Sequence, residues 1–219
     1  MNEFANLCER VGANIDDVRR GIGFDRRIGQ HFLFPGVGYG GSCFPKDVKA
    51  VIRTADQHGI DFRMLKAAEE VNERQKRTLF EKVTQHFGEY LKGMHFAVWG
   101  LAFKLRTDDM REAPAITIIE ALLAAGAEVH ASDPEALQEA RKIFADRVRY
   151  HRVNYEALQG ADALLIVTEW NEFRRPDFER MRKLMKHPVI FDGRNLYDPD
   201  DMRSRGFTYY SVGRRPVQP

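Results

Sequence analysis

One cysteine stands where a reactive nucleophile could be placed. Cys43 follows a glycine-rich run, residues 36–41, and is itself followed by Pro45, Lys46 and Asp47. Proline suits the first turn of a helix, so Cys43 is expected just before a helix N-terminus. The partial positive charge of that terminus and the ammonium of Lys46 both favour the thiolate, the reactive form of cysteine. The glycines would let the backbone approach a ligand closely, and Asp47 could hydrogen-bond a water or the thiol. The pattern therefore indicates a nucleophile loop.

The same glycines permit two other interpretations. Gly36, Gly38 and Gly41 match the G-x-G-x-x-G spacing of dinucleotide-binding loops. That fingerprint requires a strand before it and a second strand after its helix, whereas here Pro35 precedes the first glycine and another helix comes next. A simple mobile turn needs only closely spaced glycines, but it leaves the cysteine, lysine and aspartate unexplained. We therefore favour the nucleophile loop.

The elements that must position this loop fall into two segments. Residues 1–92 predict helices and no strand, the longest running from about 62 to 91 with Leu79, Val83, Phe87 and Leu91 at a spacing of four. Residues 93–219 alternate strands, at 95–100, 127–134, 148–151, 161–170, 187–193 and 208–212, with helices at 115–125, 134–144 and 178–185. This alternation predicts a doubly wound parallel sheet. The fold class is thus α/β: a helical segment carrying the cysteine loop (1–92), then a Rossmann-like domain (93–219).

Composition narrows the function classes. The chain has 219 residues, and 34 basic against 32 acidic side chains give no bulk attraction to nucleic acid. No apolar run approaches the roughly 18 residues that a bilayer span needs, and the acidic N-terminus is not a secretory signal. We expect a cytoplasmic protein with free thiols, no membrane partner and no metal site. Cys8 is expected in the core, and the tail around Arg214 and Arg215 is expected to be a disordered, solvated end.

Several stretches resemble one enzyme family. GVGYGGSCFPKD resembles the catalytic loop of the UDP-glucose 6-dehydrogenase family, and the overlapping run FDRRIGQHFLFPGVGYGG resembles the same family. WGLAFKLRTDDMREAP (99–114) and FDGRNLYDP (191–199) resemble its UDP-sugar domain, so the similarity covers essentially the whole chain. The resemblance implies NAD-dependent oxidation of UDP-glucose to UDP-glucuronate with two NAD. The loop cysteine captures the aldehyde as a thiohemiacetal, hydride loss gives a thioester, and water hydrolyses it. The GDP-mannose and UDP-N-acetylmannosamine dehydrogenases have related loops and remain alternatives.

The resemblance also assigns roles to residues of this chain. Cys43 matches the nucleophile, Asp47 the aspartate that helps to organise the catalytic water, and Arg27 an arginine that reaches the substrate of a neighbouring subunit. Positions that line the sugar pocket match Phe32, Leu33 and Tyr39. Positions that hold the UDP portion match Phe103, Lys104 and Arg194. Positions that touch NAD match Lys46 and Arg111.

Topology supports two of these ligands independently. Lys104 follows the first strand of the second segment and Arg194 follows the fifth. Both should therefore face the carboxyl edge of the sheet, where doubly wound folds bind ligands, and two cations at one crevice suit a pyrophosphate. Taken singly, Arg27 or Lys104 is more simply a solvated surface charge. Asp133 could mimic a ribose-binding acid, but an Asp-Pro pair more simply caps the next helix.

The sequence also departs from the family. The family's chains are much longer and begin with an NAD-binding domain, and their active-site lysine and asparagine precede the residues that match Met1 to Glu3. We therefore expect this chain to bind the UDP-sugar without turnover. We also expect a homodimer held by residues 1–92, with the Leu79/Val83 stripe buried between copies. The alternative is a non-catalytic UDP-sugar-binding and dimerisation module in which Cys43 is idle.

Overall fold

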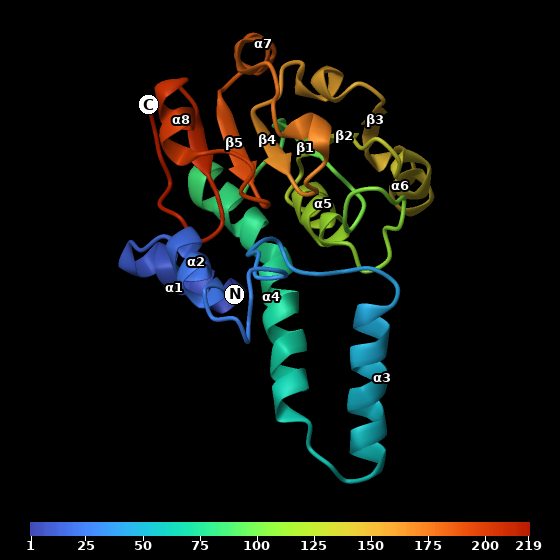
Figure 1. Ribbon diagram of the computed structural model, residues 1–219. Coiled ribbons are helices and arrows are strands. Elements are labelled where there is room, and N and C mark those ends of the chain that lie inside the picture. Colours follow the sequence, from blue (N-terminus) through green and yellow to red (C-terminus); the bar gives the residue numbers. More distant parts are fainter.

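Parallel strands build the sheet of the second segment. The computed structural model describes residues 1–219, and its six strands lie in the order β3-β2-β1-β4-β5-β6 (Figure 1). They are β1 (His95–Trp99), β2 (Glu128–Ser132), β3 (Arg149–His151), β4 (Ala163–Ile166), β5 (Val189–Asp192) and β6 (Thr208–Tyr210). Every neighbouring pair is parallel, and the order reverses between β1 and β4. The predicted Rossmann-like α/β fold is confirmed, and the reversal marks the topological switch point where such sheets bind ligands.

Helices cover both faces of this sheet. They are α5 (Pro114–Ala124), α6 (Leu137–Phe144), α7 (Phe178–Leu184) and α8 (Pro199–Ser204), with short 3₁₀ turns at Ala145–Arg147, Asn154–Leu158 and Asn171–Phe173. Side chains alternate along each strand, so Phe96 and Val98 of β1 face one core and Ala97 and Trp99 face the other. The first core is closed by α4, α5 and α6, and the second by α7, α8 and the 3₁₀ turn at Asn154–Leu158.

The first segment is entirely helical, as predicted. It consists of α1 (Asn2–Val11), α2 (Ile15–Gly23), α3 (Phe44–Gln57) and α4 (Arg63–Phe87). The α3 helix and the first half of α4 form a hairpin arm that projects from the body, whereas the second half of α4 runs along the sheet beside α5 (Figure 1). The glycine-rich loop lies where the arm meets the body.

The apolar stripe of α4 is buried within the chain, which corrects one expectation. Leu79, Val83 and Leu91 are 1%, 0% and 0% exposed, and they belong to the core shared with α5 and the sheet. Residues 1–92 contain no strand, so taken alone they could cover the stripe only with a second copy. In the fold, the sheet covers it instead.

The C-terminal residues are also ordered, contrary to expectation. Arg214 is only 7% exposed; its guanidinium donates to Ser211 Oγ (3.0 Å) and Tyr209 Oη (3.0 Å) and lies 3.5 Å from Asp16 of α2. Val217 forms an antiparallel bridge with Tyr209. The segment after β6 therefore acts as a strap between the sheet and the first helices.

The strap is tied to α1 and α2 through one glycine. The Gly213 carbonyl accepts from Ile15 N–H (2.9 Å), and its own N–H donates to the Glu9 carboxylate (2.7 Å). Gly213 has φ +72°, and a Cβ there would lie 2.6 Å from Ile15 and 2.7 Å from Ala5, so only glycine fits. Cys8 is 4% exposed in the same small core, as expected. No helix combines the length and apolarity needed to cross a bilayer.

Candidate functional site

The glycine-rich loop, residues 36–41, is wedged between α4 and the loops at the carboxyl edge of the sheet. Gly41 N–H donates to the Arg111 carbonyl at 2.8 Å. A Cβ on Gly40 would lie 2.3 Å from the Glu112 carbonyl oxygen, and one on Gly41 would lie 2.8 Å from the Phe103 ring. The glycines are thus required by close packing of backbone against backbone and ring. No strand precedes them and two helices come after them, so the dinucleotide fingerprint does not apply.

Cys43 stands at the beginning of α3, as predicted. It is the N-cap residue, it is exposed, and its Sγ lies 3.6 Å from Ser42 Oγ. Asp47, in the first turn, donates its backbone N–H to the Cys43 carbonyl at 2.9 Å. Lys46 Nζ is 3.9 Å from the Asp47 carboxylate, a loose pair between two exposed side chains. The thiol is therefore reachable from solvent, with a carboxylate and an ammonium one turn away.

A cationic hollow adjoins Cys43. It has a volume of about 490 Å³ and is lined by Gly41, Ser42, Lys46, Lys49, Ala50, Arg53, Arg111 and Glu112. Arg111 is fixed by Asp109, at 2.9 Å and 3.0 Å. This pairing raises the pKa of Arg111. Lys46 and Arg111, the two predicted NAD contacts, therefore lie together in a site suited to an anion.

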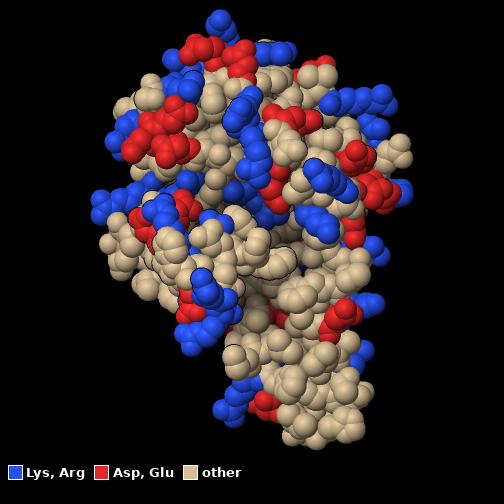
Figure 2. Space-filling model, viewed as in Figure 1, with Lys and Arg blue, Asp and Glu red and all other residues tan.

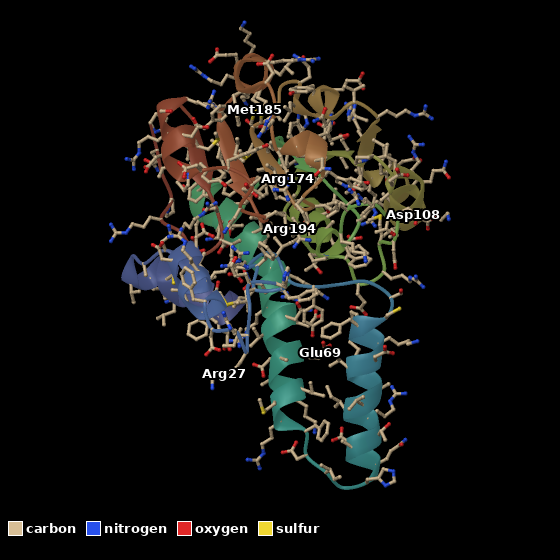
Figure 3. The ribbon with its side chains drawn as sticks, in the orientation of Figure 1. Arg27, Glu69, Asp108, Arg174, Met185 and Arg194 are labelled. Carbon is tan, nitrogen blue, oxygen red and sulfur yellow. The ribbon has the colours of Figure 1, made fainter.

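A second group of predicted residues meets at the carboxyl edge of the sheet. Arg194, just after β5, donates from Nη2 to the Phe103 carbonyl at 3.1 Å. Its Nε lies 2.7 Å from Glu169 Oε2; the N–H does not point along that line, so the contact is an ion pair without hydrogen-bond alignment. Lys104 Nζ is 5.2 Å from the centroid of the Phe103 ring. Figure 3 shows Arg194 between the sheet and α4.

The loop connects these two groups. A Cβ on Gly36 would lie 3.3 Å from Arg194 Nη1 and 3.0 Å from the Gly193 carbonyl oxygen. Five residues later, Gly41 touches Phe103 and leads into Ser42 and Cys43. One short loop thus contacts the arginine at one end and carries the thiol at the other.

Tyr39 lies inside this loop. Its hydroxyl donates to the Glu69 carboxylate, and its ring meets the Phe44 ring edge-on with centroids 4.9 Å apart. Burial, followed by the hydrogen bond to Glu69, raises the pKa of Tyr39 well above its ordinary value. The ring therefore stays neutral and packs against the residue next to Cys43.

Comparison with known proteins decides the family. Residues 97–199 match the UDP binding domain of the UDP-glucose/GDP-mannose dehydrogenase family, and residues 1–74 match its central domain. The chain belongs to the UDP-glucose/GDP-mannose dehydrogenase family. The resemblance drawn from the loop sequence is confirmed at this level.

Individual relatives agree with the family match. The UDP-glucose 6-dehydrogenase of Pseudomonas aeruginosa is 50% identical over 219 residues, covering 98% of this chain and 48% of that protein. The solved structure of a UDP-glucose dehydrogenase from Pyrobaculum islandicum aligns with TM-score 0.85 at 33% identity, over 98% of this chain and 46% of that one. A UDP-D-ManNAc dehydrogenase from Pyrococcus horikoshii aligns with TM-score 0.78 at 31% identity, over 99% and 48%. The chain spans about half the length of the curated relatives it matches.

Three predicted residues of this family member lie away from both groups. The Arg27 side chain is 88% exposed, pairs only with Asp25 (2.6 Å) and points away from the body (Figure 3). Phe32 is 99% exposed with φ +64°, and Leu33 is partly buried beside it. The structure does not bring these side chains to Arg194 or Cys43 within one chain.

Sequence reasoning missed the polar residues that support the loop. Asn72 and Gln75 of α4 are 3% and 1% exposed and hydrogen-bond the loop backbone. The signal was present, because positions 72 and 75 continue the helical face that carries Leu79 and Val83. Polar residues on a core-facing stripe must have partners. Glu169, which pairs with Arg194, carried no such signal because it lies in an irregular loop.

Asp133 has a structural role in this fold. It is 1% exposed; one carboxylate oxygen accepts from Leu101 N–H (2.7 Å) and Trp170 Nε1–H (3.0 Å). The other oxygen accepts from the backbone N–H groups of Glu135 and Ala136, both at 2.9 Å, just before α6. These bonds hold the turn before α6, whose N-cap is Ala136 without a side-chain cap, so the expected capping of this helix by Asp133 is wrong. The same side chain also joins the loops that follow β1 and β4.

Proposed function

We propose that the chain is the UDP-sugar-binding and nucleophile-bearing part of a UDP-glucose 6-dehydrogenase. The observation that carries this proposal is the loop of residues 36–41, which contacts Arg194 at one end and leads into Cys43 at the other. A nucleotide sugar bound at Arg194 would extend its sugar along this loop toward the thiol. The substrate itself would then span the distance between Arg194 and Cys43, with its pyrophosphate at the arginine and its C6 carbon at the thiol.

The charged end has a defined set of partners. Lys104 and Arg194 would bind the pyrophosphate, because both lie at the carboxyl edge near the switch point. Arg194 is already oriented by Glu169 and by the Phe103 carbonyl, so its guanidinium loses little freedom on binding. The Phe103 ring provides an apolar surface beside the two cations.

The reacting end is assigned to Cys43 and Asp47. The Cys43 thiolate attacks the C6 aldehyde and forms a carbon–sulfur bond, giving a thiohemiacetal. Loss of hydride from that carbon leaves a thioester, and water then displaces the thiolate to give the carboxylate. Asp47 is placed one turn from Cys43, where its carboxylate can orient this water. NAD, when bound, supplies the hydride acceptor for both oxidations.

Only part of an NAD site is formed by these residues. Lys46, Lys49, Arg53 and Arg111 around the hollow suit the phosphates of a dinucleotide. No strand–glycine–helix fingerprint occurs among residues 1–219 to seat it. We therefore infer that this 219-residue chain binds the UDP-sugar but does not turn it over alone.

A homodimer is part of the proposal. Apolar side chains remain exposed on α1, where Phe4, Leu7 and Val11 are 52%, 55% and 65% exposed, and on the α3–α4 arm. Figure 2 shows few charged side chains on the visible face of the lower arm. A second copy covering these surfaces would also receive the outward-pointing Arg27.

Calorimetric titration tests the proposal. The chain should bind UDP-glucose, and NADH should not form when NAD is added to the complex. The UDP-D-ManNAc dehydrogenase among the structural relatives makes UDP-N-acetylmannosamine the competing substrate, so it and GDP-mannose should be titrated in parallel. Tighter binding of either would move the assignment to that nucleotide sugar. Absence of binding to all of them would refute the proposed function.

A further inference from the structure

We propose that Asn72 and Gln75 of α4 are positioning residues that hold the glycine-rich loop, and so set where Cys43 stands relative to Arg194. The inference rests on the proposed function of this site and adds two residues to it. Neither residue hydrogen-bonds the side chain of a residue that is assigned to the substrate. Each acts through the backbone of residues 36–39.

The Asn72 side chain forms two hydrogen bonds to the backbone of Tyr39. Its Oδ1 accepts from Tyr39 N–H at 2.8 Å, and its Nδ2 donates to the Tyr39 carbonyl at 3.1 Å. Both backbone groups of Tyr39 are therefore satisfied by one side-chain amide. A Cβ on the preceding Gly38 would lie 2.8 Å from Asn72 Oδ1, and Gly38 has φ +97°. The loop is shaped to fit against this amide.

Gln75 holds the start of the loop together with α1. Its Nε2 donates to the Gly36 carbonyl at 2.7 Å, and its Oε1 accepts from Asn6 Nδ2 at 3.1 Å. On the other side, Asn2 Oδ1 accepts from Gly36 N–H at 3.0 Å. Both polar groups of Gly36 are thus bonded, one to α1 and one to α4. The two helices and the loop form one hydrogen-bonded unit.

The choice of residue type supports this role. Burying an amide side chain is costly unless it is hydrogen-bonded, and an apolar residue would pack at these core-facing positions without that cost. All the side-chain hydrogen bonds of Asn72 and Gln75 go to the loop or to α1, and none goes to another residue of α4. Their contribution to the fold is therefore the placement of the loop.

A short series of contacts connects the position of the loop to the position of the Cys43 thiol. Tyr39, held by Asn72, packs its ring against Phe44, the residue that follows Cys43. At the start of the loop, Gly36 lies against the Arg194 guanidinium. Loss of the hydrogen bonds from Asn72 or Gln75 would let the loop move relative to Arg194 and Phe44. Binding at Arg194 and shielding of Cys43 should then no longer occur together.

The experiment compares Asn72→Leu and Gln75→Met with Gln85→Met, an exposed glutamine on the same helix. Hydrogen exchange of the 33–43 peptide is measured first, well below the unfolding temperature. We expect exchange of the loop amides to rise roughly tenfold in the first two variants, the effect of losing one net backbone hydrogen bond, and to stay unchanged in the third. Asn72→Asp, which keeps the acceptor and loses the donor, serves if Asn72→Leu does not fold.

The second measurement is protection of Cys43 from iodoacetamide by saturating UDP-glucose. Wild type and Gln85→Met should be protected, and Asn72→Leu and Gln75→Met should lose most of that protection. Unchanged loop exchange would overturn the inference, and so would raised exchange with full protection. If wild type does not bind UDP-glucose, the proposed function fails, and the positioning role is then judged on loop exchange and on the alkylation rate of Cys43 without ligand.

Discussion

Arg194 and Phe103 are joined by a hydrogen bond of 3.1 Å from the guanidinium Nη2 to the backbone carbonyl. Arg194 follows β5 and Phe103 follows β1, and β4 lies between these strands in the sheet. The bond therefore fixes two loops of the carboxyl edge to one another across the switch point. Any ligand that pairs with the guanidinium meets an arginine whose direction is already set.

Substitution of Arg194 should weaken UDP-glucose binding. Arg194→Ala removes a charge-assisted partner of the pyrophosphate, and we expect the dissociation constant to rise roughly tenfold to a hundredfold. Arg203→Ala, an exposed arginine of α8, should leave the constant unchanged. Calorimetric titration of both variants checks this. Equal affinity of Arg194→Ala and wild type would remove Arg194 from the site.

The two cysteines should differ strongly in reactivity. Cys43 is exposed at the beginning of α3, whereas Cys8 is 4% exposed in the core of α1 and α2. At neutral pH, iodoacetamide should alkylate Cys43 at least roughly tenfold faster, because reaction at Cys8 requires local opening. Mass spectrometry of the native protein at short times measures the ratio. Faster labelling of Cys8 would contradict the assignment of the nucleophile.

Arg214 should be needed for stability. Arg214→Ala removes the donor to Tyr209 Oη and Ser211 Oγ and the ion pair with Asp16, all at a buried position. We expect a loss of roughly 2–4 kcal/mol in the free energy of unfolding. The neighbouring Arg215→Ala, at an exposed position, should cost less than about 1 kcal/mol. Urea denaturation measures the free energy of unfolding of both variants. Equal midpoints for Arg214→Ala and Arg215→Ala would show that the strap does not depend on the Arg214 side chain.

The sequence predicted the order of elements well because their patterns are local. Alternating apolar strands and the helix start at Pro45 each depend on residues close together in the chain. The long helix ends at Phe87 rather than near residue 91 as expected. The range 161–170 was too long for a strand. Thr168 and Trp170 are buried like β4 but lie beyond it and bond Ala102 and Asp133 instead of a neighbouring strand. Hydropathy does not separate a buried strand from a buried loop.

Contacts between residues far apart in the chain could not be predicted from the sequence. The burial of Leu79 by the sheet and the capture of Arg214 by Asp16 both join residues far apart along the chain. The candidate site likewise contains both local and long-range relationships. Cys43, Lys46 and Asp47 are neighbours in sequence, so their proximity was predictable, whereas the pairing of Arg194 with Glu169 needed the fold.

Acid should destabilise the fold through stacked histidines. His130 lies between His95 and His151, with ring centroids 3.7 Å and 5.0 Å away. Burial and the neighbouring His95 lower the pKa of His130 to about 4, although Glu128 opposes this, and burial also lowers the pKa of His95. The ordinary value is 6.5, so the unfolded chain binds more protons below that pH. The stability is therefore complete above pH 6.5 and is lost as the pH falls toward 4.

Urea unfolding at pH 7.5 and pH 5 measures this effect. We expect a loss on the order of 1–2 kcal/mol from this group. His130→Asn should flatten the dependence between these pH values, while His58→Asn, at an exposed position at the end of α3, should preserve it. An identical pH dependence in His130→Asn and wild type would show that the stacked rings are not its source.

Self-association should depend on α1. Ala5 and Cys8 face the interior of the chain, and Phe4, Leu7 and Val11 form a neighbouring, exposed face of the helix. Such a face is most simply covered by a second copy, since two-fold assembly is the commonest arrangement of soluble chains. We expect a dimer in sedimentation velocity at micromolar concentration. Leu7→Asp would place a carboxylate in the interface and should weaken the dimer at least roughly tenfold. Val153→Asp, at a similarly exposed apolar position on the sheet domain, should leave it intact. A wild-type monomer, or equal effects of the two substitutions, would show that α1 is not the contact.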